Sequence, residues 1–138
     1  MIKIFVLALA LFAGLQLVAR FWPLVTSDWP GAPMAAGQTV QTHLSGFYIH
    51  RDDLSLTQIQ DRILATPHQA VLMHQPRLKV VLRSRFWGFK DIVELWRDES
   101  GTHLRGYSTI GGSDWGSNKK RIEAWIADEN RGKSPAPS

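Results

Sequence analysis

Apolar and polar positions divide the chain into a long apolar run, a stretch rich in proline and glycine, and a region of alternating patterns. The apolar run extends from Ile4 to Ala19, with Lys3 before it and Arg20 after it. A helix needs about 20 such residues to cross a bilayer, and a basic side chain at either end can reach the headgroups. The pattern therefore predicts a membrane anchor over residues 1–22, in which residues 4–22 contact the bilayer.

A cleaved signal peptide is the alternative interpretation of this run. Cleavage after Ala19 would place the bulky Leu17 where a cleavage site needs a small side chain, which favours an uncleaved anchor. Between Arg20 and Arg51 the chain has no Lys or Arg, a composition typical of a translocated flank. We therefore expect a single pass through the inner (cytoplasmic) membrane, with the N-terminus inside and the C-terminal domain outside the cytoplasm, in the periplasm or an equivalent compartment.

The chain after the anchor divides into a linker, a domain and a tail. Three prolines and three glycines fall between Pro23 and Gly46, which predicts an extended linker over residues 23–46. Residues 129–138 are polar and end in Ser-Pro-Ala-Pro-Ser, a composition typical of a disordered tail. The remaining residues, 47–128, are numerous enough for one small two-layer domain.

The clearest periodicity in this domain lies between Arg77 and Trp87. Two sets of side chains alternate there, apolar at Leu78, Val80, Leu82 and Phe86 and basic at Arg77, Lys79, Arg83 and Arg85. A period of two predicts a strand with one buried face. Ser55 and Gln58 occupy the two positions of a capping box, so a helix should begin there and end before Pro67. The other predicted elements are strands over 47–50, 69–74, 91–97 and 103–110 and a helix over 118–127.

This order of elements predicts an α+β fold, in which an N-terminal transmembrane helix precedes a small antiparallel sheet covered on one face by two helices. The opposite face of the sheet should be basic. The chain carries a net charge of +4, and ten Lys/Arg face five Asp/Glu between Arg77 and Arg121. A basic domain suits an anionic partner such as a lipid headgroup, a nucleic acid or a phosphorylated small molecule.

The sequence lacks the residues that several kinds of functional site require. The chain has no cysteine, which excludes disulfides, Cys-based zinc sites, thiol catalysis and a lipid-modified cysteine. Its five histidines show no metal-ligand spacing, and no phosphate-loop or dinucleotide motif occurs. We therefore expect no metal and no cofactor, and we assign no catalytic residue.

The segment Ser108–Trp125 joins a predicted strand to a basic helix through a turn rich in glycine and polar residues. Glycines allow a backbone that points consecutive amides inward, and a helix N-terminus adds partial positive charge, so the turn could bind an anion. In the alternative interpretation, Asp114, Ser117 or Asn118 simply caps the helix. The candidate contact residues are Gly111, Gly112, Ser113, Asp114, Trp115, Asn118, Lys119 and Arg121 in the turn, with Arg83 and Arg85 on the basic sheet face.

Two segments, Ser84–Glu94 and Ser108–Glu123, resemble the signature blocks of an uncharacterised family known as domain of unknown function 1499. The resemblance covers residues 54–127, and one family arginine is replaced by Thr109. It implies an envelope or lumenal protein and implies no activity. The positions that match the family pattern are Arg85, Asp91, Glu94, Gly111, Ser113, Asp114, Gly116, Asn118 and Arg121.

The leading functional hypothesis is a membrane-anchored binding or accessory module with a basic, anion-binding surface. Its expected partner is an anionic lipid headgroup or another envelope protein, and nucleic acid is not expected outside the cytoplasm. A hydrolase-like enzyme that uses Ser113, Asp114 and Glu94 is one alternative. A purely structural domain, with its polar signature satisfied internally, is another.

Overall fold

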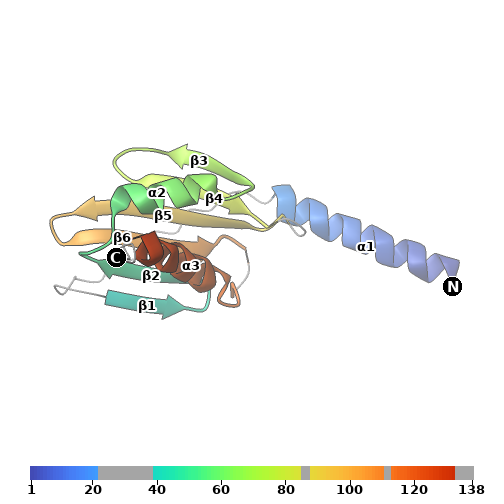
Figure 1. The fold of residues 1–138 in the computed structure, drawn as a ribbon. Coiled ribbons are helices and arrows are strands. Elements are labelled where there is room, and N and C mark those ends of the chain that lie inside the picture. The colour runs from blue at the N-terminus through green and yellow to red at the C-terminus, as the bar shows by residue number, and fades with distance from the viewer. Residues whose placement is uncertain (22–38, 85–87, 111–112, 133–138) are drawn as a thin grey trace.

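The computed structural model of the chain describes residues 1–21, 39–84, 88–110 and 113–132 (Figure 1). A helix, α1 (Ile2–Phe21), projects from one end of a domain that contains a six-stranded sheet and two further helices. The predicted linker up to residue 38 and the predicted tail from residue 133 lie outside the described residues.

α1 is long and apolar enough to cross a membrane. Its 20 residues rise about 1.5 Å each, which gives a length of about 30 Å, the hydrocarbon thickness of a bilayer. The large apolar side chains of α1 are exposed, and Ala19 is its one buried residue. The domain therefore leaves the apolar surface of this helix uncovered. Signal sequences share this composition and position in a chain.

The sheet is antiparallel throughout, and its strands follow the order β1-β2-β6-β5-β4-β3. The central pair, β5 and β6, forms a hairpin in which Asp98 pairs with Gly101. The α+β fold with an antiparallel sheet is thus confirmed. The strands are β1 (Thr39–His43), β2 (Gly46–Arg51), β3 (Gln69–Met73), β4 (Leu78–Arg83), β5 (Lys90–Asp98) and β6 (Gly101–Ser108).

Two helices, α2 (Leu56–Ala65) and α3 (Ser117–Gly132), cover one face of the sheet, as predicted (Figure 1). α2 begins at the predicted cap, where Ser55 Oγ accepts a hydrogen bond from the Gln58 amide at 3.4 Å. The apolar face of each helix and the alternating apolar positions of the strands meet in one core. Its largest fully buried apolar side chains are Phe47, Leu54, Ile59, Ile63, Leu95, Leu104 and Ile122.

Three element boundaries differ from the sequence expectation. Thr39–His43 form a strand within the range predicted as linker, because this segment pairs with β2 across a tight turn. β4 ends at Arg83, where the Ser84 and Phe89 backbones bond across the loop and turn the chain back. α3 continues to Gly132, into the range predicted as tail.

Candidate functional site

Side chains of the polar turn before α3 accept hydrogen bonds from backbone amides of the turn and of the start of α3. Asp114 Oδ2 accepts from the Asn118 amide at 3.2 Å, and its Oδ1 accepts from the Gly116 amide at 3.0 Å. Ser113 Oγ accepts from the Trp115 amide at 3.1 Å. Asp114 therefore satisfies amides that would otherwise be free at the start of the helix, which is the capping role that the alternative interpretation assigned to it.

Behind this cap, three further polar side chains of the family blocks interlock. Arg121 Nη1 donates to Asp91 Oδ2 at 3.2 Å and to Asn118 Oδ1 at 2.9 Å. Asn118 is fully buried against Gly106, where a Cβ atom would come within 2.6 Å of its Oδ1. Burial raises the pKa of Asp91, against the lowering effect of the Arg121 charge and hydrogen bond. These contacts tie α3 to β5 and β6.

Most other candidate residues of the turn point outward or lie outside the described residues. Lys119 is exposed and lies 6.0 Å from the Phe47 ring centroid, and Trp115 is 95% exposed. Arg83, also exposed, lies on β4 and is treated below. The structure brings Asp114, Asn118 and Arg121 together as a structural unit, and Ser113 bonds to the Trp115 amide beside it. Arg85, Gly111 and Gly112 are not among the described residues.

The three side chains of the hydrolase alternative do not form one site. Ser113 and Asp114 are engaged in the turn. Glu94 instead lies on the sheet face away from the helices, 2% exposed, between Arg105 and Lys79. As expected for residues three apart on a strand, Glu94 and Asp91 point to opposite faces. The arrangement lacks the nucleophile-to-base contact that such chemistry needs.

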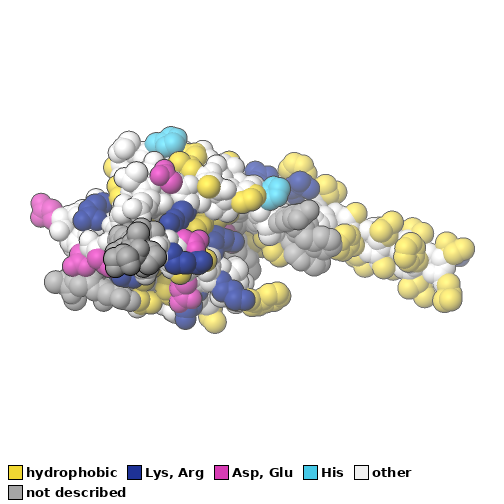
Figure 2. Space-filling view, viewed as in Figure 1, with side chains coloured by type: hydrophobic (Ala, Val, Ile, Leu, Met, Phe, Trp, Pro, Cys, Tyr) yellow, Lys and Arg dark blue, Asp and Glu magenta, His cyan; other side chains and the backbone are white. Residues whose placement is uncertain are grey.

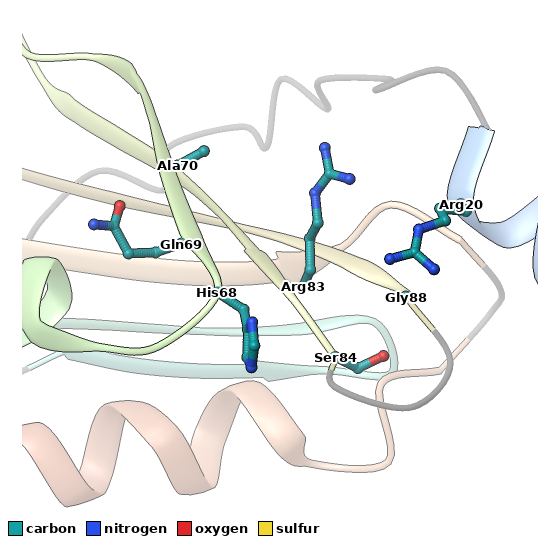
Figure 3. Close-up of a pocket in the computed structure, with 7 residues that line it drawn as sticks. All are labelled: Arg20, His68, Gln69, Ala70, Arg83, Ser84 and Gly88. Carbon is teal, nitrogen blue, oxygen red and sulfur yellow. The ribbon is translucent and has the colours of Figure 1, made fainter.

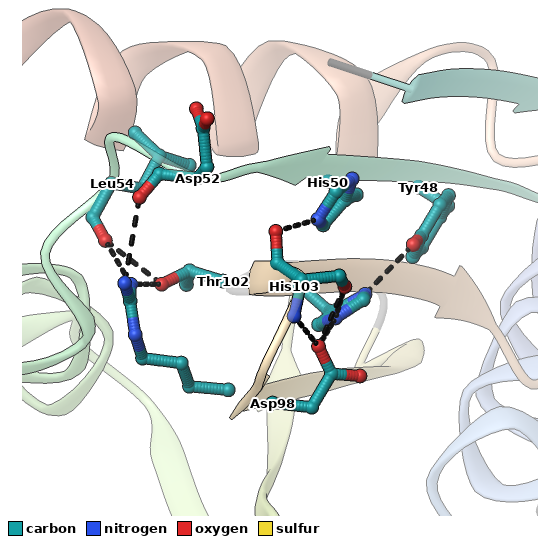
Figure 4. A network of polar contacts seen from close by, with 9 residues as sticks. Tyr48, His50, Asp52, Leu54, Asp98, Thr102 and His103 are labelled. Carbon is teal, nitrogen blue, oxygen red and sulfur yellow. Dashed lines mark hydrogen bonds and ion pairs between the residues drawn. The ribbon is translucent and has the colours of Figure 1, made fainter. Parts of the chain in front are cut away.

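A second polar cluster, which sequence reasoning missed, crosses the face of the sheet opposite the helices (Figure 4). The Tyr48 hydroxyl lies 2.9 Å from His103 Nδ1, and His103 Nε2 lies 2.9 Å from Asp98 Oδ1. Hydrogen bonds from Ser100 and His103 lower the pKa of Asp98, so this carboxylate is an acceptor only. When His103 is neutral, its Nε2 donates to Asp98 and its Nδ1 accepts a hydrogen bond from the Tyr48 hydroxyl.

The row of contacts from Tyr48 through His103 to Asp98 resembles a general-base arrangement, but Tyr48 is only 5% exposed and His103 only 1%. Burial, with a smaller contribution from the Asp98 charge, raises the pKa of Tyr48 to about 12. The phenol thus stays protonated at neutral pH, and no substrate reaches it in this conformation. No local sequence signal announces the cluster, because Tyr48 and His103 meet only through the pairing of β2 with β6.

The ionisation of Tyr48 gives a direct test of this geometry. The difference in tyrosinate absorbance between the wild type and Tyr48→Phe should show one group that titrates near pH 12. Because the raised pKa keeps a proton on the folded protein that the unfolded chain releases above its ordinary value of 10.0, stability should fall as the pH rises through this window. A Tyr48 titration centred near its ordinary value would contradict the buried hydrogen bond.

A hollow lies where α1 meets the domain (Figure 3). It has a volume of about 350 Å³. Figure 3 shows the Arg20 side chain extending from α1 toward Gly88 and the end of β4, which carries Arg83. The lining residues are Arg20, His68, Gln69, Ala70, Arg83, Ser84 and Gly88.

Arg20 and Arg83, the two arginines of this pocket, are both exposed, whereas three buried or half-buried cations of the domain are paired with carboxylates. Lys79 and Arg105 bind Glu94, and Arg121 binds Asp91. Within the described residues, neither Arg20 nor Arg83 has an ion pair or a hydrogen-bonded acceptor for its side chain. The sequence marks Arg83 as a basic surface residue, but it presents Arg20 only as the end of an apolar run.

The residues of this pocket are suited to binding an anion. Two guanidinium groups can each offer paired N–H donors to phosphate or carboxylate oxygens. Among the residues that the structure describes, no group of three or more His, Asp or Glu side chains is placed to hold a metal ion.

Comparisons with known proteins place the chain within one family. A family model described as "Protein of unknown function (DUF1499)" matches residues 31–128. The match includes both blocks that carry the resemblance seen in the sequence. A search of curated proteins finds no match. A search of solved structures finds none either.

Proposed function

This chain belongs to the DUF1499 family, and from that premise we propose that it is a membrane-anchored binding module that holds the phosphate of an anionic lipid headgroup. The family description assigns no activity, so the proposal depends on this chain's own residues. The observation that carries it is the pocket of Arg20 and Arg83 at the junction of α1 and the sheet. No bond-making chemistry is part of the proposal.

The level of the pocket relative to the membrane supports a lipid headgroup as ligand. With α1 across the bilayer, its last turn lies at the membrane surface, because the helix length of about 30 Å equals the hydrocarbon thickness. Arg20 belongs to that last turn and also lines the pocket. A phosphate at the headgroup level would therefore meet the Arg20 guanidinium without leaving the bilayer.

The electrostatics of the pocket support an anion. Arg20 and Arg83 line the same hollow, and no carboxylate is among its lining residues. Two like charges near each other repel, and a bound anion relieves that repulsion. Arginine binds phosphate with paired, charge-assisted hydrogen bonds, which add geometric selectivity to the attraction.

The proposed location follows from the flanks of α1. Lys3 precedes the helix, and after Arg20 the next Lys or Arg is Arg51. This asymmetry favours the N-terminus inside and the domain outside the cytoplasm, anchored by a single pass through the inner membrane. A reporter that works only outside the cytoplasm, fused after Ser138, should be active, and a signal from a cytoplasm-only reporter would reverse the orientation.

Arg83→Gln tests the pocket without disturbing the core, because Arg83 is exposed. The full chain in neutral detergent micelles is titrated with short-chain phosphatidylglycerol, and binding is followed by calorimetry. Loss of a charge-assisted hydrogen bond worth about 1.5–3 kcal/mol should weaken binding by at least about tenfold.

Arg131→Gln is the matched control, because it removes one exposed charge at the far end of α3. We expect its affinity to equal that of the wild type. Equal losses in the two variants would indicate attraction to net charge alone. Phosphatidylcholine and inorganic phosphate, titrated in parallel, separate the lipid headgroup from free phosphate as the source of the anion.

A further inference from the structure

The end of the domain next to α1 also carries two apolar side chains with no protein partner large enough to cover them. We propose that Leu44 and Trp115 insert into the interfacial layer of the same bilayer that α1 crosses, and so hold the domain in one orientation on the membrane. This inference shares the membrane anchor of the proposed function but is independent of the ligand of the Arg20–Arg83 pocket.

The exposure of these two side chains sets them apart. Trp115 is 95% exposed and Leu44 is 79% exposed. Every other large apolar side chain in the described part of the domain is less than half exposed. Tryptophan is a residue that proteins usually bury at least in part, and its ring is favoured at membrane interfaces. Leu44 adds further apolar area, and exposing apolar area to water is unfavourable.

Backbone hydrogen bonds hold together the two segments that carry Leu44 and Trp115. The Asp114 amide donates to the Leu44 carbonyl at 2.9 Å, and the Ser108 amide donates to the Ser45 carbonyl at 2.8 Å. The turn between β1 and β2 is thus joined to the loop between β6 and α3. Trp115 is presented from this joint with a positive φ of 50°, a conformation that non-glycine residues adopt only under local constraint. The two apolar side chains therefore form one projecting surface.

This surface lies at the end of the domain that faces the membrane. Figure 1 shows the β1–β2 turn and the turn just before α3 at the end of the sheet from which α1 emerges. In Figure 2, hydrophobic side chains project at this end with Lys and Arg side chains beside them. A helix that crosses the bilayer brings this end, and not the opposite one, to the headgroups.

The charges around Trp115 complement an anionic membrane. Lys119 and Lys120 are exposed in the first turn of α3. Positive charge at a helix N-terminus opposes the helix dipole, so these lysines weaken the helix in isolation. Anionic headgroups offer the compensating charge, and lysines beside a tryptophan are typical of the membrane interface. A lipid bilayer is therefore the occupant that fits both the apolar tips and their basic surroundings.

The absence of cysteine allows a clean test on the full chain. Leu44→Cys, Trp115→Cys and Glu99→Cys variants are each labelled with a nitroxide and reconstituted into vesicles of phosphatidylcholine and phosphatidylglycerol. Glu99 is the control, since it is exposed in the turn between β5 and β6. Collisions with oxygen, which dissolves in lipid, are compared with collisions with a water-soluble nickel complex.

Labels at positions 44 and 115 should show an oxygen-to-nickel accessibility ratio several-fold above that of the label at position 99. Equal ratios at all three positions would overturn the inference. Immobilised labels at 44 and 115 without a gain in oxygen collisions would also overturn it, because they would indicate a protein partner. Unlabelled Trp115→Ser should leave phosphatidylglycerol binding in micelles unchanged, whereas Arg83→Gln should leave the label at 115 inserted, so the two proposals fail separately.

Discussion

Glu94→Ala is expected to lower the free energy of unfolding by about 3–5 kcal/mol, the range found when one partner of a buried ion pair is removed. Glu94 Oε1 lies 2.9 Å from Lys79 Nζ, and its Oε2 accepts from Arg105 Nε. Arg105 is only 7% exposed. The variant would leave this guanidinium buried without its anion, which is why the loss should exceed that of a surface pair.

A urea titration of the full chain in detergent micelles, followed by tryptophan fluorescence, measures the loss. Glu123→Ala is the matched control, because Glu123 is exposed and its oxygen lies 4.0 Å from Lys119 Nζ. Exposed pairs contribute about 0–1 kcal/mol, so the control should stay close to the wild type. A Glu94 variant no less stable than this control would show that Lys79 and Arg105 find other acceptors.

The Glu94 carboxylate should also contribute to the way in which the free energy of unfolding changes at acidic pH. Burial alone would raise the pKa of Glu94, but the hydrogen bonds and charges of Arg105 and Lys79 lower it below the ordinary value of 4.5. A lowered pKa means that the unfolded chain binds the proton first. The stabilisation by Glu94 is thus present above pH 4.5 and is lost as the pH falls through the folded-state pKa. Glu94→Ala should flatten this part of the curve.

Gly101→Ala is the second substitution with a large expected effect, a loss of about 3–5 kcal/mol. Gly101 adopts a φ of +134°, and a Cβ atom there would lie 2.7 Å from the Asp52 Cα and 2.8 Å from the Arg51 carbonyl oxygen. The strained φ contributes about 1–3 kcal/mol and the overlap a similar amount. The overlap involves backbone atoms of the last residue of β2 and of the residue after it, which cannot move aside as a side chain would.

Gly116→Ala separates these two causes. Gly116 also has a positive φ, of +75°, but a Cβ atom there meets nothing within 4 Å. Only the conformational term applies, about 1 kcal/mol. The same urea titration compares the two variants with the wild type. Equal losses would mean that β2 and β6 shift apart easily at Gly101, and that their pairing is weaker than the contacts indicate.

Local pattern was sufficient to predict much of this fold. The alternation of Leu78, Val80 and Leu82 places β4 correctly, because a period of two needs only neighbours in sequence. Ser55 marks the start of α2 for the same reason. The spacing of three between Asp91 and Glu94 likewise predicts opposite faces of β5, and their partners agree, Arg121 of α3 for Asp91 and Lys79 and Arg105 of the sheet for Glu94.

The site depended on information that no local pattern contains. Tyr48 meets His103 because β2 pairs with β6, two strands that are separated by three other strands in the chain. Arg20 reaches Gly88 only because α1 ends at the loop between β4 and β5. The turn before α3 shows the reverse case. Its polar residues are conspicuous in sequence, yet Asp114 accepts from backbone amides of the turn and Asn118 Oδ1 accepts from Arg121. Among the described residues, Asn118 Nδ2 is buried there without a hydrogen-bond partner. Long-range pairing thus decides which polar residues remain available to a ligand.

Arg20 lies in α1 and also lines the pocket, so an α1 that crosses a bilayer would set how tightly the pocket must bind. A tethered receptor meets its ligand at an effective concentration fixed by the tether, which is millimolar for short connections. With α1 in the bilayer, headgroups surround the pocket permanently. An intrinsic affinity of about 4 kcal/mol, equal to a millimolar dissociation constant, would then keep the pocket occupied. Freed from the bilayer at dilute lipid, the same pocket would stay empty.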